Sequence, residues 1–290
     1  MEVTTYGTWG GIPLWMPNRL KYGGDTTCVR VHSPCIPKDV WVVIDGGSVF
    51  VHLALDAFKA GAKELWVLFT HYHHDHQQGL LMAPTTFIDG IKIRLFGPKE
   101  GKWDPHVMMH SVMERGLFPV DFTEQKHHFP KPKSFEHPKL HVMIIHPKGG
   151  MKHMLVSDYK SLRAKGEPFP FGQKNERYPL KECMVITMHK SNHPESTICY
   201  RMDELPTGKS FALLTDHENQ AGIPISLQRH LRDLDLLIED VQYSLHDYYQ
   251  GGKAGFGHAA PDYAVKLANL IGAKRLGFTH HDPFKDDDYV

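Results

Sequence analysis

The sequence predicts an α/β fold in which several strands end in histidine or aspartate at one edge of the sheets. Short apolar runs alternate along the chain with amphipathic stretches, as strands and helices do. Histidine is abundant, with 22 among 290 residues, and several apolar runs lead directly to a histidine or an aspartate. The content of 41% hydrophobic and 23% charged residues is ordinary for a globular protein, and a chain of this length can bury a sizeable core.

The overall charge and the cysteines argue against a nucleic-acid-binding, membrane or disulfide-bonded protein. The formal net charge is zero, so nothing in the composition indicates a nucleic-acid or membrane partner. No apolar run reaches membrane-spanning length, and the first residues lack a basic segment followed by an apolar one, so we expect a cytoplasmic protein. The four cysteines show no C-x-x-C spacing, and we expect them to be reduced and buried: Cys28, Cys35, Cys183 and Cys199.

The first 60 residues predict glycine-rich turns, two strands and a helix. Residues 28–32 alternate as a strand does, an apolar run at 41–45 ends in Asp45, and residues 48–60 predict a helix. Two glycines follow Asp45. A carboxylate at this point can orient a metal-bound histidine of a neighbouring loop, or it can cap the next helix. The sequence leaves both roles open.

The most informative stretch is H-Y-H-H-D-H at residues 71–76. It follows the apolar run 64–70, which predicts a buried strand, so the histidines lie on the loop that leaves this strand. In an extended loop His71 and His73 point the same way and can bind one ion, whereas Asp75 and His76 lie past the bend and can serve a second. Imidazole and carboxylate suit a divalent ion such as Zn²⁺. The alternative is a surface loop that is merely rich in histidine, and the fixed order of these residues argues against it.

Residues 124–182 stand out by their basic composition and weak periodicity, after a predicted strand at 91–96 and a predicted helix at 106–115. The stretch contains 12 lysines and arginines but only 6 acidic residues, and it is rich in proline and histidine. We interpret it as an insertion in a single domain of residues 1–290. It could form a basic lid over an anionic substrate, or a solvated insertion or dimer contact. We expect a homodimer.

The C-terminal part repeats the pattern of a strand that leads to a candidate ligand. Predicted strands lie at 183–188, 198–201, 210–214, 234–240 and 275–281, and an amphipathic helix lies at 261–271. The candidate ligands after these strands are His193, Asp216 and either His280 or His281. Adjacent side chains on a strand point in opposite directions, so only one of the last two histidines can face the site. Because the strands come from both halves of the chain, these residues are expected to cluster along one edge of the sheets.

Taken in order, these residues resemble the pattern of the metallo-β-lactamase superfamily. The resemblance implies a four-layer αββα sandwich with two metal ions in a cleft at one sheet edge. It also implies the ligands: His71, His73 and His193 for one ion, Asp75, His76 and His280 for the other, and Asp216 as a bridge between them.

Within the superfamily, several details resemble the phosphodiesterase branch that includes tRNase Z and the small cyclic phosphodiesterases. Gly257-His258-Ala259, placed before a helix, is similar to the H-S-T motif of that branch, although Ala259 and Ala260 replace its serine and threonine. Position 73 is histidine, whereas flavodiiron relatives carry glutamate there, which argues against an oxygen-reducing diiron enzyme.

The resemblance implies a metal-dependent hydrolase, and we expect a phosphodiesterase that cleaves a small cyclic phosphate or cyclic nucleotide. Its cofactors are expected to be two divalent ions, Zn²⁺ first and Mn²⁺ or iron as alternatives, which lower the pKa of a bridging water. Asp75 is the candidate to accept the proton of that water. His258 is the candidate to contact the phosphate and to protonate the leaving oxygen, and a structural or helix-capping histidine is the alternative for it.

Three other functions stay open at this point. A tRNA 3′-end endonuclease would need a long basic arm to hold RNA, and the zero net charge makes nucleic acid the less favoured partner. The same metal pair could hydrolyse a lactone or thioester. Finally, a non-catalytic protein could have kept the fold, although it should then have lost at least one ligand.

Overall fold

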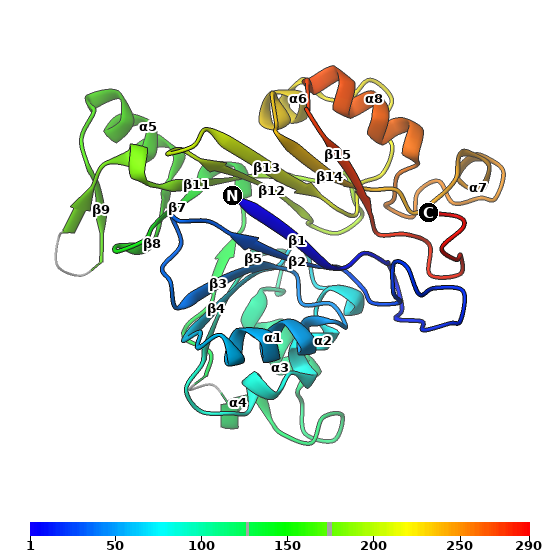
Figure 1. The fold of residues 1–290 in the computed structure, drawn as a ribbon, viewed down its shortest axis with the longest axis horizontal. Coiled ribbons are helices and arrows are strands. Elements are labelled where there is room, and N and C mark those ends of the chain that lie inside the picture. Colours follow the sequence, from blue (N-terminus) through cyan, green and yellow to red (C-terminus); the bar gives the residue numbers. More distant parts are fainter. Residues whose placement is uncertain (126–127, 173–175) are drawn as a thin grey trace.

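The computed structural model describes residues 1–125, 128–172 and 176–290. Two mixed sheets pack face to face, and helices cover both outer faces (Figure 1). In Figure 1, helices α1 (Phe50–Lys59), α2 (Gln78–Met82) and α3 (Pro105–Val112) lie below the first sheet. Helices α6 (Ile225–Leu231) and α8 (Pro261–Ile271) lie above the second sheet. The predicted four-layer αββα sandwich is confirmed.

The first sheet has six strands in the order β1-β2-β3-β4-β5-β6. The bounds are Glu2–Gly7 for β1, Cys28–His32 for β2, Val40–Ile44 for β3, Glu64–Leu68 for β4, Lys92–Pro98 for β5 and Lys133–Phe135 for β6. Strands β1, β2 and β3 pair antiparallel, whereas β3, β4, β5 and β6 run parallel. The carboxyl ends of β3 and β4 therefore meet at one edge of the sheet.

The second sheet has seven strands in the order β15-β14-β13-β12-β11-β7-β8. The bounds are His141–His146 for β7, Gly150–Leu155 for β8, Met184–Lys190 for β11, Ile198–Glu204 for β12, Lys209–Leu214 for β13, Leu236–Asp240 for β14 and Leu276–Thr279 for β15. Strands β13, β14 and β15 pair parallel and the other neighbours antiparallel. The ends of β13, β14 and β15 thus lie side by side.

The remaining elements are short. They are the strand pair β9 (Phe169–Phe171) and β10 (Glu176–Tyr178), the helices α4 (Phe122–Gln125), α5 (Val156–Lys165) and α7 (Leu245–Tyr249), and the 3₁₀ turns η1 (His74–His76), η2 (Pro84–Thr86), η3 (Pro138–Leu140) and η4 (Leu180–Glu182).

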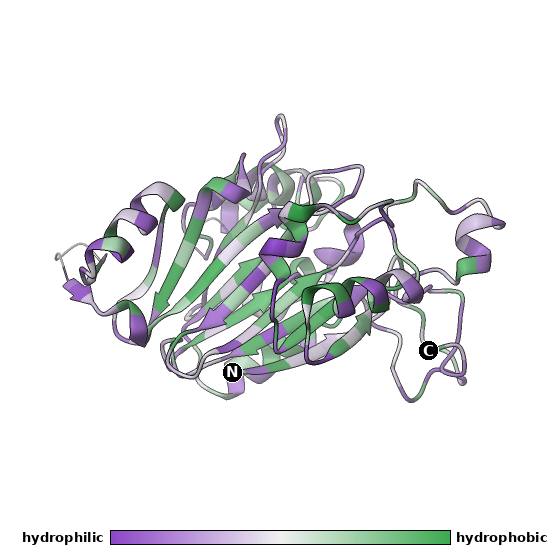
Figure 2. Ribbon diagram, turned by 90° about the horizontal axis from the view of Figure 1, so that it is seen from above, coloured by the Kyte–Doolittle hydropathy of each residue, from purple (hydrophilic) through white to green (hydrophobic). Residues whose placement is uncertain are grey.

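Alternating side chains divide the interior into layers. On β4, Trp66 and Leu68 point into the core between the two sheets, whereas Leu65 and Val67 pack under the helices of the first sheet. This is the period of two that a strand buried on both faces requires. Apolar residues accordingly concentrate on the strands in the middle of the molecule, and polar residues occupy the outer loops (Figure 2).

All predicted strands and helices are present, with bounds that differ by a few residues. The structure adds elements that the sequence analysis did not identify, among them β1, α6 and α7. Most of the additions lie in 124–182, where β6 joins the first sheet and β7 and β8 join the second. That the chain is one domain with an insertion at 124–182 stays a prediction. Because β6, β7 and β8 belong to the two main sheets, an insertion could include only the residues outside these strands. Lys126 and Lys174 of this stretch lie outside the described residues.

Two expectations about composition can be compared with the structure. All four cysteines are buried and free, as predicted. In the described ranges, no helix combines the length and apolar character needed to cross a membrane.

Candidate metal centre

The candidate ligands follow strand ends that converge from both sheets. The loop after β4 carries His71 to His76, while His193 follows β11, Asp216 follows β13 and His280 follows β15. Asp216 and His280 have positive φ angles of 49° and 59°, a conformation that is uncommon for residues other than glycine. Strained backbone at these strand ends directs both side chains toward the same point.

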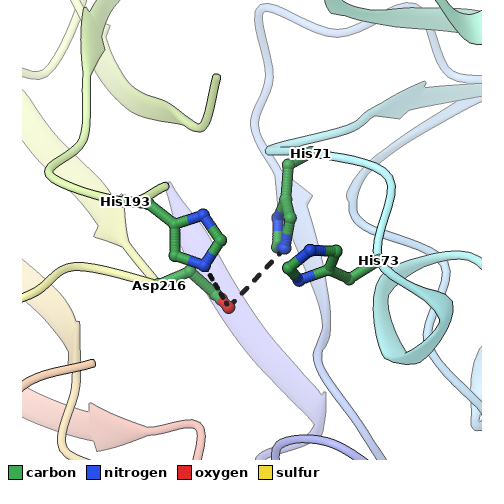
Figure 3. A group of neighbouring side chains, drawn as sticks. All are labelled: His71, His73, His193 and Asp216. Atoms are coloured by element: carbon green, nitrogen blue, oxygen red, sulfur yellow. Dashed lines mark ion pairs between the residues drawn. The ribbon is translucent and has the colours of Figure 1, made fainter. Parts of the chain in front are cut away.

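The first group consists of His71, His73, His193 and Asp216, whose ligand atoms lie within 4.8 Å of one another. Figure 3 shows the three imidazoles arranged around the Asp216 carboxylate. Asp216 Oδ2 lies 3.6 Å from His71 Nε2 and 3.9 Å from His193 Nε2. His71 Nε2 is buried and has no hydrogen-bond partner within the described part of the chain.

The second group consists of Asp75, His76 and His280, also within 4.8 Å. His280 Nε2 lies 3.1 Å from Asp75 Oδ2, and His76 Nε2 lies 3.3 Å from the same oxygen. Asp216 Oδ1 lies 3.2 Å from His76 Nε2 and 3.4 Å from His280 Nε2. One oxygen of Asp216 therefore faces the first group and the other faces the second.

In four of the imidazoles, Nδ1 forms a hydrogen bond outside the cluster, so that Nε2 points into the cluster. The Nδ1 partners are Thr70 Oγ1 at 3.1 Å for His71, Asp45 Oδ2 at 2.9 Å for His76, Thr197 Oγ1 at 3.1 Å for His193 and Gln242 Oε1 at 3.1 Å for His280. A hydrogen bond at one ring nitrogen orients the ring and sets which nitrogen is free for a metal. His73 differs, because its side chain is 47% exposed and its Nε2 lies 3.4 Å from Glu195.

Asp45, whose role the sequence left open, supports the histidine loop. Its carboxylate accepts hydrogen bonds from the backbone N–H and the hydroxyl of Thr70, at 2.7 and 2.8 Å, and pairs with His76. Asp45 makes no side-chain cap on the helix that follows it. Asp45 therefore orients a histidine of the neighbouring loop and does not cap the helix.

The electrostatics of the cluster reflect many ionisable groups in a small buried volume. Burial lowers the pKa of His193 to about 4 and that of His71 well below its usual value. Burial also disfavours the charged form of His280, but Asp216 and Asp75 outweigh this effect and raise its pKa to about 9. In the same way, His280 and His76 overcome the effect of burial and hold the pKa of Asp216 well below its usual range. The carboxylates thus stay ionised, as metal ligands must.

His258 lies beside this cluster, and the structure reveals a partner for it. His258 Nδ1 is 2.7 Å from Asp240 Oδ2, and its ring stacks on His280 with 4.8 Å between centroids. Its side chain is 13% exposed, so the ring borders both the cluster and solvent. The loop before it is fixed by Glu218, which accepts hydrogen bonds from the backbone N–H groups of Gly255 and Gly257 at 3.1 and 2.6 Å.

Asp240 received no role in the sequence analysis, although its signal was present. It is the last residue of β14, so it is an acidic residue at a strand end, as Asp45 is. The residue is fully buried. Sequence alone gave no indication that this particular carboxylate would face His258, because the two residues are brought together only by the loop after β14.

The structure also separates the two C-terminal histidines. His280 belongs to the cluster, whereas the ring of His281 packs edge-on against Trp9 with 5.7 Å between centroids. Burial lowers the pKa of His281 to about 4. Of the two, His280 is therefore the histidine that lies in the cluster after the last strand.

Comparison with known proteins gives one relative in sequence and several in structure. No family model matches the chain. It is 26% identical over 231 residues to a ribonuclease Z from Myxococcus xanthus, an alignment that covers 77% of this chain and 71% of that protein.

Two solved structures share the fold over nearly the whole chain. The metallo-β-lactamase fold protein YhfI of Bacillus subtilis has a TM-score of 0.58 and 19% identity, covering 99% of this chain and 88% of that one. The short form of human tRNase Z has a TM-score of 0.57 and 17% identity, covering 97% and 93%.

Proposed function

Since the chain is a metallo-β-lactamase-fold hydrolase related to ribonuclease Z, we propose that it is a dinuclear phosphodiesterase whose favoured substrate is a small cyclic phosphate or cyclic nucleotide. The observation that carries the proposal is the position of Asp216 between two groups of ligands, with one carboxylate oxygen facing each. A carboxylate placed in this way can be shared by a pair of neighbouring divalent ions.

The residues fit two divalent ions. The unpartnered, buried Nε2 of His71 needs a partner that the described residues do not supply, and a metal ion is such a partner. In the proposal His71, His73 and His193 would hold one ion, Asp75, His76 and His280 would hold the other, and Asp216 would be shared between the two groups. The donors are imidazole nitrogen and carboxylate oxygen without thiolate, a set that suits Zn²⁺ and also accepts Mn²⁺ or iron.

When bound, such a pair of ions supplies hydroxide from water near neutral pH and positive charge for the phosphate oxygens. The chain provides the proton transfers. Asp75 would accept the proton of the attacking water, since its carboxylate lies beside the imidazoles that would hold the second ion, 3.1 Å from His280 Nε2 and 3.3 Å from His76 Nε2. His258 contacts the phosphate and protonates the leaving oxygen through Nε2, because Asp240 occupies its Nδ1. Asp240 is thus a positioning residue for His258.

A ribonuclease Z-like activity on tRNA 3′ ends is the second candidate, favoured by the sequence relative from Myxococcus xanthus. Against it stands the position of the basic stretch 124–182. Lys131, Lys133, Lys148 and Lys152 of this stretch line a cavity that also contains Glu64 and Lys92, at the start of β4 and β5. The histidine loop follows the other end of β4, so these lysines lie away from the site where RNA would be cut.

The two candidates can be separated with one panel of substrates. Cyclic mononucleotides, a linear aryl phosphodiester, a precursor tRNA and a lactone are incubated with metal-loaded protein at several salt concentrations. Turnover of a cyclic mononucleotide with little salt dependence is expected. Cleavage of the precursor tRNA alone, weakened steeply by salt, would replace the proposal with the ribonuclease function. Hydrolysis of the lactone alone would reject both.

A further inference from the structure

A large cavity lies away from the metal centre, at the edge of the sandwich where β3, β4 and β5 begin. Its volume is about 1040 Å³, and the turn between β7 and β8 closes one side of it. β4 starts at Glu64 in this cavity and leads to His71 in the metal centre, seven residues later, so these two residues are at most roughly 23 Å apart at about 3.3 Å per residue. In Figure 1, β8 lies near the left end of the molecule and the C-terminal segment after β15 near the right end.

The walls of the cavity carry a strong excess of positive charge. The basic residues are Lys63, Lys92, Arg94, Lys131, Lys133, Lys148 and Lys152, and the acidic residues are Asp39, Glu64 and Asp89. Glu64 is already neutralised, because Arg94 pairs with it at 2.6 Å and Trp66 Nε1 donates to it at 2.7 Å. Within the described ranges, none of the six lysines forms an ion pair.

A half-buried histidine lies among these lysines. His153 also lines the cavity, and its pKa falls to about 4, first because of burial and then because of His141, Lys133 and Lys152. Six like charges gathered on one concave surface repel one another, so an anion that binds there is attracted by all of them.

We propose that this cavity binds a compact polyphosphate anion, either inorganic polyphosphate or the phosphate chain of a nucleoside triphosphate. Lysine ammonium groups bind phosphate as separate point charges, whereas the one arginine fork, on Arg94, is occupied by Glu64. The volume is that of a small-molecule site.

The lining residues argue against single-stranded nucleic acid as the occupant. Such ligands need exposed aromatic faces on which bases can stack. The aromatic residues of the wall, Trp66 and Phe96, are only 4% and 6% exposed, so they offer no such face. Lys131, Lys133, Lys148 and Lys152 of the basic stretch 124–182 therefore form one wall of the anion site.

Binding of inorganic tripolyphosphate and of ATP to the full-length protein, measured by calorimetry at low salt, tests the proposal. The cavity variant carries Lys92→Glu and Lys152→Glu. The matched control carries Lys59→Glu and Lys266→Glu, which make the same charge change at exposed positions on α1 and α8. We expect the cavity variant to bind tripolyphosphate at least roughly tenfold more weakly than the control. Hydrolysis of an aryl phosphodiester should be equal in both, which shows that the variants are folded.

The outcomes separate the sources and the alternatives. Equal affinity of the unmodified protein for tripolyphosphate and ATP identifies the phosphate chain as the ligand, and tighter binding of ATP identifies a nucleotide. Because any binding at the metal centre is common to both variants, equal affinities of cavity variant and control would overturn the proposal. So would the absence of tripolyphosphate binding, or much tighter binding of a short RNA duplex to the same lysines.

Discussion

Replacement of Asp240 by asparagine should slow turnover without removing the metals. The carboxylate lies 2.7 Å from His258 Nδ1 and is fully buried, so it makes a charge-assisted hydrogen bond that water does not screen. Such bonds contribute about 1.5–3 kcal/mol, which corresponds to a loss of about 10- to 150-fold in kcat if the bond persists in the transition state. Asparagine keeps one oxygen, which can still accept from the backbone N–H of Gln242 as Asp240 Oδ1 does at 2.9 Å, and only the longer bond from the His217 N–H to Oδ2, at 3.3 Å, is lost, so the fold should persist.

A double-mutant cycle with His258→Ala makes this test specific. If Asp240 acts only through His258, the double variant is no slower than His258→Ala alone, which itself should lose roughly 10²- to 10⁴-fold. Asp235→Asn, at the other end of the same strand, is the control, because it removes a carboxylate that pairs with Lys274 and Lys209. Metal content is measured for every variant. Full activity of Asp240→Asn, or multiplicative losses in the double variant, would refute the reasoning.

Three further predictions follow from the same geometry. Asp216→Ala should lose metal and hydrolysis together, measured by elemental analysis and phosphodiesterase assay, and retention of two ions per chain would contradict the shared role of this carboxylate. Because the pKa of His280 is about 9 without metal, this residue is protonated at pH 7, so metal affinity should rise between pH 7 and 9. Calorimetry of metal binding in buffers of different ionisation enthalpy should detect proton release at pH 7. The absence of proton release would contradict the prediction. Gly79→Ala should lower the free energy of unfolding by about 1–3 kcal/mol, measured by urea titration, because the added Cβ would lie 2.0 Å from the Gly47 carbonyl oxygen. Unchanged stability would contradict this prediction and would show that the backbone at Gly47 shifts to make room.

The sequence predicted the parts of this protein in which local pattern and chemistry agree. β4 is buried on both faces and reads as an unbroken apolar run, and H-Y-H-H-D-H at its end has few interpretations besides a metal site. The candidate ligands on distant strand ends, which the structure brings together, could be named for the same reason, because each follows a recognisable strand. The choice of His280 over His281 needed the structure, since a one-residue shift at a strand end reverses the direction of the side chain.

The sequence was least informative where tertiary contacts override local pattern. β7 is apolar and largely buried, yet it lies among prolines, lysines and histidines that hide its period. Helix α5 has no buried residue, so no amphipathic stripe marks it. The position of Lys148 and Lys152, away from the metal centre, depends on the pairing of β7 with β11, which is 38 or more residues distant in the chain.

The most direct test of the metal-centre proposal is the location of the bound ions in a crystal of the metal-loaded protein by anomalous diffraction. Two ions per chain are predicted, one among His71, His73 and His193, the other among Asp75, His76 and His280, with Asp216 in contact with both. A single ion, no ion, or ions held by residues outside these groups would contradict it.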